Sequence, residues 1–118
     1  MYIFDSKLKK KVLFEPQESG IVKMYVCGPT VYDYSHLGHA RSAISFDLLR
    51  RTLGALGLKV VLAKNFTDID DKIIKKAREE DKDIGEITSY FTEKYLEEMG
   101  ALNVLRPDFE PKATDYLG

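Results

Sequence analysis

The stretch that decides the fold is MYVCGPTVYDYSHLGHAR, residues 24–41. It joins an apolar run that ends in the only cysteine, Cys27, to a loop of turn residues, after which residues 36–39 open a long amphipathic segment. A strand, a loop and a helix start in this order are typical of the place where open α/β sheets carry nucleotide chemistry, beyond the carboxyl end of a strand. We therefore predict an α/β fold organised around this turn.

The flanking segments predict a βαβ unit. Residues 21–27 are almost continuously apolar, which is typical of a buried, central, parallel strand. Residues 37–56 have helical periodicity and residues 58–66 have a second strand pattern, so the two strands should be parallel with a right-handed crossover in a Rossmann-like sheet. We expect Ser35 to cap the helix and Gly57 to follow its last residue. The helical stripe comprises Ala43, Phe46, Leu49, Leu53 and Leu56.

A further helix is expected to begin near residue 67. Thr67 or Asp68 can cap it, and Asp70 and Asp71 then lie in its first turn, so this acidic cluster needs no role beyond helix stability. The turn at 81–83 separates it from another helix. That helix has one packing stripe, comprising Ile84, Ile87, Phe91, Tyr95, Met99 and Leu102.

The two ends of the chain predict less regular structure. Apolar runs at 2–4 and 12–14 flank a lysine-rich turn and predict a hairpin or two edge strands. Residues 106–111 have the composition of a loop, and residues 112–118 have that of the beginning of a helix. Because the sequence stops one or two turns into this helix, we expect the chain to be part of a longer protein.

Size and composition are those of one ordinary domain. The 118 residues are 44% hydrophobic and 31% charged, and the net charge of −1 provides no global basic field of the kind that indicates a nucleic-acid binder. We find no apolar run of membrane-spanning length and no signal-peptide pattern, so we expect a cytoplasmic protein. A single cysteine excludes an internal disulfide framework.

The two histidines suit phosphate chemistry. His36 and His39 share one face of the expected helix start, where the backbone already favours an anion, and Gly38 between them leaves room for a ligand. Their N–H groups suit a nucleoside triphosphate whose α-phosphate is attacked, since preorganised donors stabilise the charge that develops on its oxygens. An H-x-x-H pair often occurs by chance. Its position after a buried-type strand, at the start of a helix and around a small residue favours a ligand-binding role over a chance pair.

Cys27 has three possible roles. The thiol can be buried, which is the commonest state of a free cysteine, or it can act as a nucleophile or as a zinc ligand at the end of the strand. A tetrahedral zinc site needs four ligands, and the two histidines leave such a site incomplete within 118 residues.

Four segments together resemble one enzyme family. They are MYVCGPTVYD at 24–33, HLGHAR at 36–41, NFTDIDDKII at 65–74 and ALNVLRP at 101–107. In order and spacing they are similar to the N-terminal part of cysteinyl-tRNA synthetases, which are class I aminoacyl-tRNA synthetases. The resemblance covers nearly the whole chain and implies that residues 1–118 are the N-terminal portion of a Rossmann-like catalytic domain, truncated before its second half.

The resemblance implies a role for several residues. Residues 36–39 take the place of the family's HIGH motif, with Leu37 for isoleucine, which makes His36 and His39 the expected catalytic residues. Cys27 takes the place of the first zinc ligand, and the remaining ligands lie outside this chain. The expected ATP-binding residues are Thr30, His36, Gly38 and His39, and those expected to bind the amino acid are Gly28 and Thr67.

The activity implied is that of an aminoacyl-tRNA ligase, which activates cysteine with ATP and Mg²⁺ to cysteinyl-adenylate and transfers it to tRNA(Cys). Zn²⁺ binding the substrate thiolate would separate cysteine from serine, which shape alone separates poorly. The family's KMSKS loop and tRNA-binding helices are absent, so we expect the chain alone to be inactive, with weak ATP affinity at most. The alternatives are the ligase that joins cysteine to an amino-sugar inositol in mycothiol synthesis and a non-catalytic nucleotide-binding half-domain.

Overall fold

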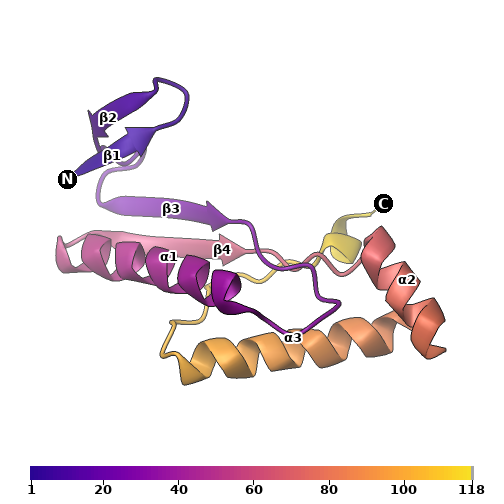
Figure 1. Ribbon diagram of the computed structural model, residues 1–118. Coiled ribbons are helices and arrows are strands. Elements are labelled where there is room, and N and C mark those ends of the chain that lie inside the picture. Colours follow the sequence, from indigo (N-terminus) through magenta and orange to yellow (C-terminus); the bar gives the residue numbers. More distant parts are fainter. Residues whose placement is uncertain (118) are drawn as a thin grey trace.

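A computed structural model describes residues 1–117. In chain order the elements are β1 (Tyr2–Asp5), β2 (Lys10–Leu13), β3 (Ile21–Val26), α1 (Leu37–Ala55), β4 (Lys59–Lys64), α2 (Asp71–Glu80), α3 (Ile84–Ala101) and the 3₁₀ helix η1 (Ala113–Tyr116). Figure 1 shows β3 and β4 side by side, with α1 along them and α3 below α1. Helix α2 lies beside the N-terminal end of α3. Both the fold class and the order of the elements match a Rossmann-like half-domain.

The βαβ unit is confirmed. β3 pairs with β4 in parallel, from Ile21 opposite Lys59 to Val26 opposite Lys64. Helix α1 connects the two strands and packs against β4. Because the strands are parallel, Cys27 after β3 and Asn65 after β4 lie at the same edge of the sheet.

The segment after α3 extends this sheet. The predicted loop at 106–111 is an extended stretch that runs parallel to the second strand, with bridges from Ala63 to Phe109 and from Phe66 to Lys112. Its carbonyls accept hydrogen bonds from the N–H groups of Lys64 and Phe66, each at 2.9 Å. It is followed by η1, a single 3₁₀ turn where the beginning of a helix was predicted, and Gly118 lies outside the described residues.

The prediction that β3 is buried on both faces is wrong for the part of the chain that the structure describes. Within residues 1–117, β3 pairs with β4 along one edge only. Val22 and Val26 are buried, whereas Tyr25, on the opposite face of the pleat, is 68% exposed. The strand therefore alternates between a buried face and an exposed face, and the exposed face carries a lysine and a tyrosine.

Helix α1 begins at Leu37, as predicted, but its N-cap lies one residue later than predicted. His36, not Ser35, is the N-cap, and its side chain accepts the N–H of Gly38. Gly57 follows the helix with φ +86°, as predicted, since a left-handed conformation there suits glycine. In the predicted stripe Ala43 and Leu53 are buried; the prediction is wrong for Phe46 and Leu56, which are exposed.

Helix α2 begins later than predicted. Asp70 is the N-cap and accepts the N–H of Lys72 at 2.9 Å, whereas neither Thr67 nor Asp68 caps the helix. Asp68 is buried and instead accepts two hydrogen bonds from Thr114, one from the backbone N–H at 3.0 Å and one from the hydroxyl at 2.6 Å. The helix-stabilising role expected for this acidic cluster is therefore confirmed for Asp70, which is the cap instead of a first-turn residue, and for Asp71, which lies in the first turn, but it is wrong for Asp68.

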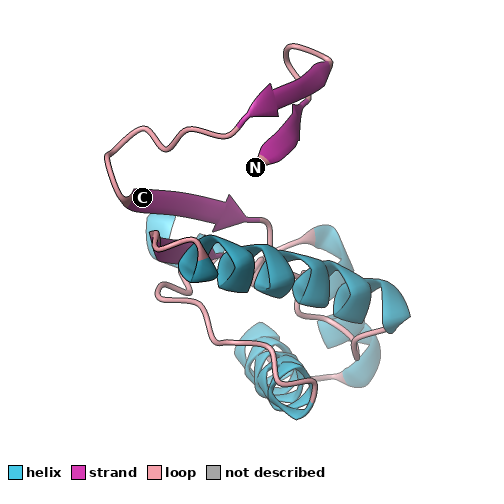
Figure 2. Ribbon diagram, turned by 90° about the vertical axis from the view of Figure 1, so that its left-hand side faces the viewer, coloured by secondary structure: helices cyan, strands magenta, loops and turns pink. Residues whose placement is uncertain are grey.

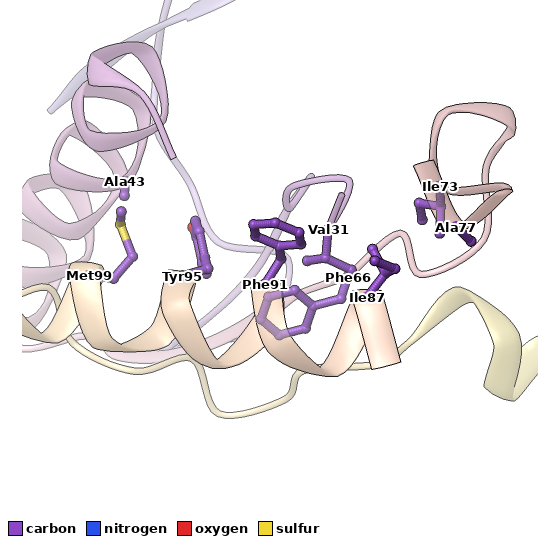
Figure 3. Close-up of a cluster of buried hydrophobic side chains, with 9 residues drawn as sticks. All are labelled: Val31, Ala43, Phe66, Ile73, Ala77, Ile87, Phe91, Tyr95 and Met99. Carbon is purple, nitrogen blue, oxygen red and sulfur yellow. The ribbon is translucent and has the colours of Figure 1, made fainter. Parts of the chain in front are cut away.

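The core lies between α3, the start of α1 and the end of the sheet. Figure 3 shows the α3 side chains of Ile87, Phe91, Tyr95 and Met99 packed in one row, and burial of all four confirms most of the predicted stripe. Leu102, its last predicted member, is exposed. The other members of the cluster are Val31, Ala43, Phe66, Ile73 and Ala77.

The predicted N-terminal hairpin is confirmed. β1 and β2 pair antiparallel, from Tyr2 opposite Leu13 to Asp5 opposite Lys10. Figure 2 shows the hairpin standing apart from the layers of strands and helices. No helix described in residues 1–117 is long and apolar enough to cross a membrane.

Candidate active site at the carboxyl edge of the sheet

The loop after β3 runs tightly against the segment after β4. The N–H of Gly28 donates to the side-chain oxygen of Asn65 at 2.8 Å. A Cβ atom at position 28 would lie 1.6 Å from the carbonyl oxygen of Asn65, a distance that no side chain tolerates. Position 28 is therefore restricted to glycine by close backbone approach, and Asn65 fixes the loop that carries the cysteine.

Thr30 and Thr67 are held side by side by backbone pairing. The N–H of Val31 donates to the carbonyl of Thr67 at 3.1 Å, and the N–H of Thr67 donates to the carbonyl of Pro29 at 3.0 Å. Val31 is buried in the core and so anchors the loop after β3. The two threonines, far apart in the sequence, thus belong to one rigid edge.

The start of α1 is built from the two histidines. The N–H of Gly38 donates to Nδ1 of His36 at 3.0 Å, and the N–H of His36 donates to Nδ1 of His39 at 3.1 Å. This is a capping box in which imidazoles replace the usual hydroxyl and carboxylate acceptors. Because each Nδ1 accepts a hydrogen bond, a neutral ring carries its proton on Nε2, and no group in residues 1–117 accepts a hydrogen bond from either Nε2–H.

A cavity of about 270 Å³ lies where these three features meet. Cys27, Gly28, Thr30 and His39, all predicted from the sequence, line it. His36 joins them through its contact with the ring of His39, with ring centroids 4.0 Å apart. The remaining lining residues are Pro29, Ser42, Lys64 and Tyr95.

Comparison with known proteins identifies the family. A family model described as tRNA synthetases class I (C) catalytic domain matches residues 13–118, which include every residue of the cavity. The chain belongs to this family. The family match begins at the last residue of β2, so most of the hairpin lies outside it.

The curated relatives compared with this chain are all named cysteine–tRNA ligase. The cysteine–tRNA ligases of Campylobacter hominis and of Sulfurovum sp. (strain NBC37-1) are each 64% identical over 117 residues, which are 99% of this chain and 25% of those proteins. The cysteine–tRNA ligase of Helicobacter pylori (strain Shi470) is 61% identical with the same coverage. The chain therefore spans about a quarter of the length of the curated relatives it matches.

Electrostatics favour the neutral form of the second histidine. Partial burial, and then the neighbouring His36, hold the pKa of His39 below its ordinary value, while Glu98 opposes this shift. A proton added at Nδ1 of His39 would also displace the N–H of His36 from its acceptor. The start of α1 therefore presents its second histidine as a neutral donor.

Cys27 is an exposed thiol, so burial, the commonest state for a free cysteine, is wrong for this residue. Its Sγ has one long contact, 3.8 Å to the carbonyl oxygen of Gly28. Within residues 1–117 no group of three or more His, Cys, Asp or Glu side chains is arranged to hold a metal ion. The open thiol thus fits one position of a tetrahedral zinc site, and the described residues do not complete that site.

Sequence reasoning missed three residues at this edge. Lys64 is the last residue of β4 and Asn65 follows it, so the rule that ligands bind beyond the carboxyl ends of parallel strands could have singled them out. Tyr95 gave no such signal, because its spacing on α3 is that of a packing residue. Only the tertiary structure brings its ring to the wall of the cavity.

Proposed function

We propose that the chain forms the N-terminal part of the catalytic domain of a cysteine–tRNA ligase. Such an enzyme makes cysteinyl-adenylate from cysteine and ATP and then transfers the cysteinyl group to tRNA(Cys). The observation that carries the proposal is one cavity, lined by Cys27, Gly28, Thr30 and His39, in a chain 64% identical to proteins of that name. We also propose a cytoplasmic location, because the proposed enzyme acts on tRNA(Cys).

The triphosphate of ATP, with its Mg²⁺, is proposed to bind at the start of α1. The free Nε2–H groups of His36 and His39 would donate to phosphate oxygens, and the unfilled N–H groups of the first turn favour the same negative charge. Gly38 leaves the backbone accessible, and Thr30 borders the nucleotide from the adjacent loop. The histidines stabilise charge in the transition state, and the attacking carboxylate needs no general base.

The amino acid is proposed to bind on the opposite side of the cavity. The backbone of Gly28 and the hydroxyl of Thr67 would hold its amino-acid moiety. Cys27 would be the first zinc ligand, with the others supplied from outside this chain. Zinc, when bound, would supply a thiolate-selective contact that distinguishes cysteine from serine.

We propose that residues 1–118 alone are inactive. One thiol does not hold zinc, and the chain lacks the KMSKS loop with which the family completes its ATP site. The relatives give no support to an amino-sugar-inositol ligase or to a non-catalytic half-domain, because all those compared are named cysteine–tRNA ligase.

ATP–pyrophosphate exchange tests the proposed function. The full-length protein that contains this chain should exchange labelled pyrophosphate into ATP in the presence of cysteine but not of serine, and should charge tRNA(Cys). Residues 1–118 expressed alone should give background exchange. Transfer of cysteine to an amino-sugar inositol instead of tRNA would overturn the assignment, and robust exchange by the short chain would overturn its inactivity.

A further inference from the structure

Lys64, the last residue of β4, lines the cavity that the predicted site residues share. Its stem is packed in place: Cγ lies 3.4 Å from the position that a Cβ on Gly28 would take. Its Nζ lies 5.2 Å from the centroid of the Tyr95 ring, which is itself buried. The side chain is therefore half-buried and ordered by its neighbours, unlike a lysine that extends into solvent.

The charge of Lys64 has no carboxylate to balance it. In residues 1–117 no carboxylate oxygen lies within 4.0 Å of its Nζ, whereas Lys76, Lys82 and Lys94 each pair with a glutamate. Burial lowers the pKa of Lys64, which indicates that the charged form lacks a compensating partner. Half-buried cations without a partner carry a desolvation cost, and such groups cluster at binding sites.

The position of Lys64 relative to the proposed half-sites defines what it can bind. Cys27 and Gly28, proposed for the amino acid, and His39, proposed for the triphosphate, line the same cavity. The carboxylate of the amino acid and the α-phosphate must meet between these half-sites. Both groups are anionic, so their approach is opposed by Coulomb repulsion that a cation between them offsets.

We propose that Lys64 is an anion-binding residue of the adenylation step, whose ammonium group binds oxygens at the junction of the cysteine carboxylate and the α-phosphate. The inference rests on the proposed function. In this step a carboxylate oxygen forms a bond to the α-phosphorus, and the bond from that phosphorus to the β-phosphate oxygen breaks. The electron pair leaves with pyrophosphate, no proton is transferred, and Lys64 stays protonated throughout.

The test uses two variants of the full-length protein. Lys64→Met keeps the apolar stem and removes the charge, whereas Lys64→Arg keeps the charge. Lys59→Met is the matched control, because Lys59 is exposed at the other end of the same strand. We expect kcat/KM for ATP–pyrophosphate exchange to fall about 100-fold in Lys64→Met, to be largely restored in Lys64→Arg, and to be unchanged in Lys59→Met.

The kinetic split separates the two anions. A raised KM for cysteine assigns the contact to the carboxylate, a raised KM for ATP assigns it to the phosphate, and a lowered kcat alone assigns it to the transition state. Wild-type kinetics in Lys64→Met, with or without a lowered melting temperature, would overturn the inference, since Lys64 would then only pack against Tyr95.

Failure of the proposed function gives a different result. In that case the wild-type protein shows no cysteine-dependent exchange, and calorimetric titration with ATP decides the role of Lys64. Weaker binding of ATP by Lys64→Met than by the wild type and Lys59→Met would support an anion-binding role. Equal affinities in the three proteins would overturn it.

Discussion

The starts of α1 and α3 have the same hydrogen-bond pattern and opposite chemistry. In α3, Asp83 accepts the N–H of Gly85 at 2.8 Å and Glu86 accepts the N–H of Asp83 at 3.0 Å. In α1, His36 and His39 make the corresponding two bonds. Two carboxylates complement the helix dipole and leave no attraction for an anion, whereas two imidazoles, which carry no negative charge, leave the positive end of α1 uncompensated.

The difference shows how a helix start can serve stability or binding. Helix α1 has no acidic residue in its first turn, and its capping side chains each retain a free N–H. A carboxylate cap of the kind found in α3 has no donor left and would repel a phosphate. We therefore expect exchange of one cap for the other to separate folding from function.

The largest effect is expected when α1 receives the cap of α3. The double variant His36→Asp, His39→Glu should keep the capping bonds and the fold, while exchange activity falls by about 10³-fold or more, since two donors become two negative charges. ATP–pyrophosphate exchange and thermal unfolding of the full-length protein measure the two effects. Activity within tenfold of wild type would show that the histidines act only as caps.

Removal of the cap of α3 should affect stability alone. Asp83→Ala removes the acceptor for the N–H of Gly85 and should cost about 1 kcal/mol of unfolding free energy. Exchange activity measured well below the melting temperature should be unchanged, because Asp83 does not line the cavity. Denaturant titration measures the cost, and a matching fall in kcat at full folding would contradict this separation of roles.

The cap of α1 should also respond to acid. The pKa of His39 lies below its ordinary value of 6.5, so the unfolded chain gains this proton at higher pH than the folded chain does. The stability that His39 contributes is thus present in full above about pH 6.5 and is lost as the pH falls through the lower folded-state pKa. Unfolding free energies of wild type and His39→Asn should converge as the pH is lowered. A constant difference would contradict the prediction.

The smallest effect is expected at Glu98. One of its carboxylate oxygens is buried and has no hydrogen-bond partner among residues 1–117, and its charge raises the pKa of His39. Glu98→Gln should therefore lower the pKa of His39 further, which NMR titration of labelled histidine can detect. Glu97→Gln is the control, because Glu97 is paired with Lys94 at the surface. An unchanged His39 pKa in Glu98→Gln, or an equal shift in the control, would refute the coupling.

Local patterns in the sequence predicted most of the fold. The βαβ unit follows from the strand and helix periodicities, and the α3 stripe follows from regular spacing of large apolar residues. The extended pairing of residues 108–112 with β4 was not predictable in this way, because its hydrogen bonds join segments more than forty residues apart. The stretch 106–111 contains two prolines and resembles a loop until its tertiary partner is known.

The candidate site was predictable in part, for a physical reason. The sequence singled out Cys27 and the two histidines because their side-chain chemistry is rare and their position relative to a strand is informative. It missed the histidine cap, since histidine is not among the common N-cap residues. It also missed Lys64: the residue stands at the end of a parallel strand, but its half-buried side chain and the lack of a paired carboxylate are visible only in the structure.

The link between Asp68 and Thr114 bears on how the chain matures on the ribosome. Asp68 follows directly after Thr67, and its two acceptor bonds come from a residue 46 positions later in the chain. At about 5–20 residues per second, Thr114 is made roughly 2–9 s after Asp68. The edge that carries Thr67 is therefore secured only after α3 has been synthesised, so the nascent chain completes this edge late.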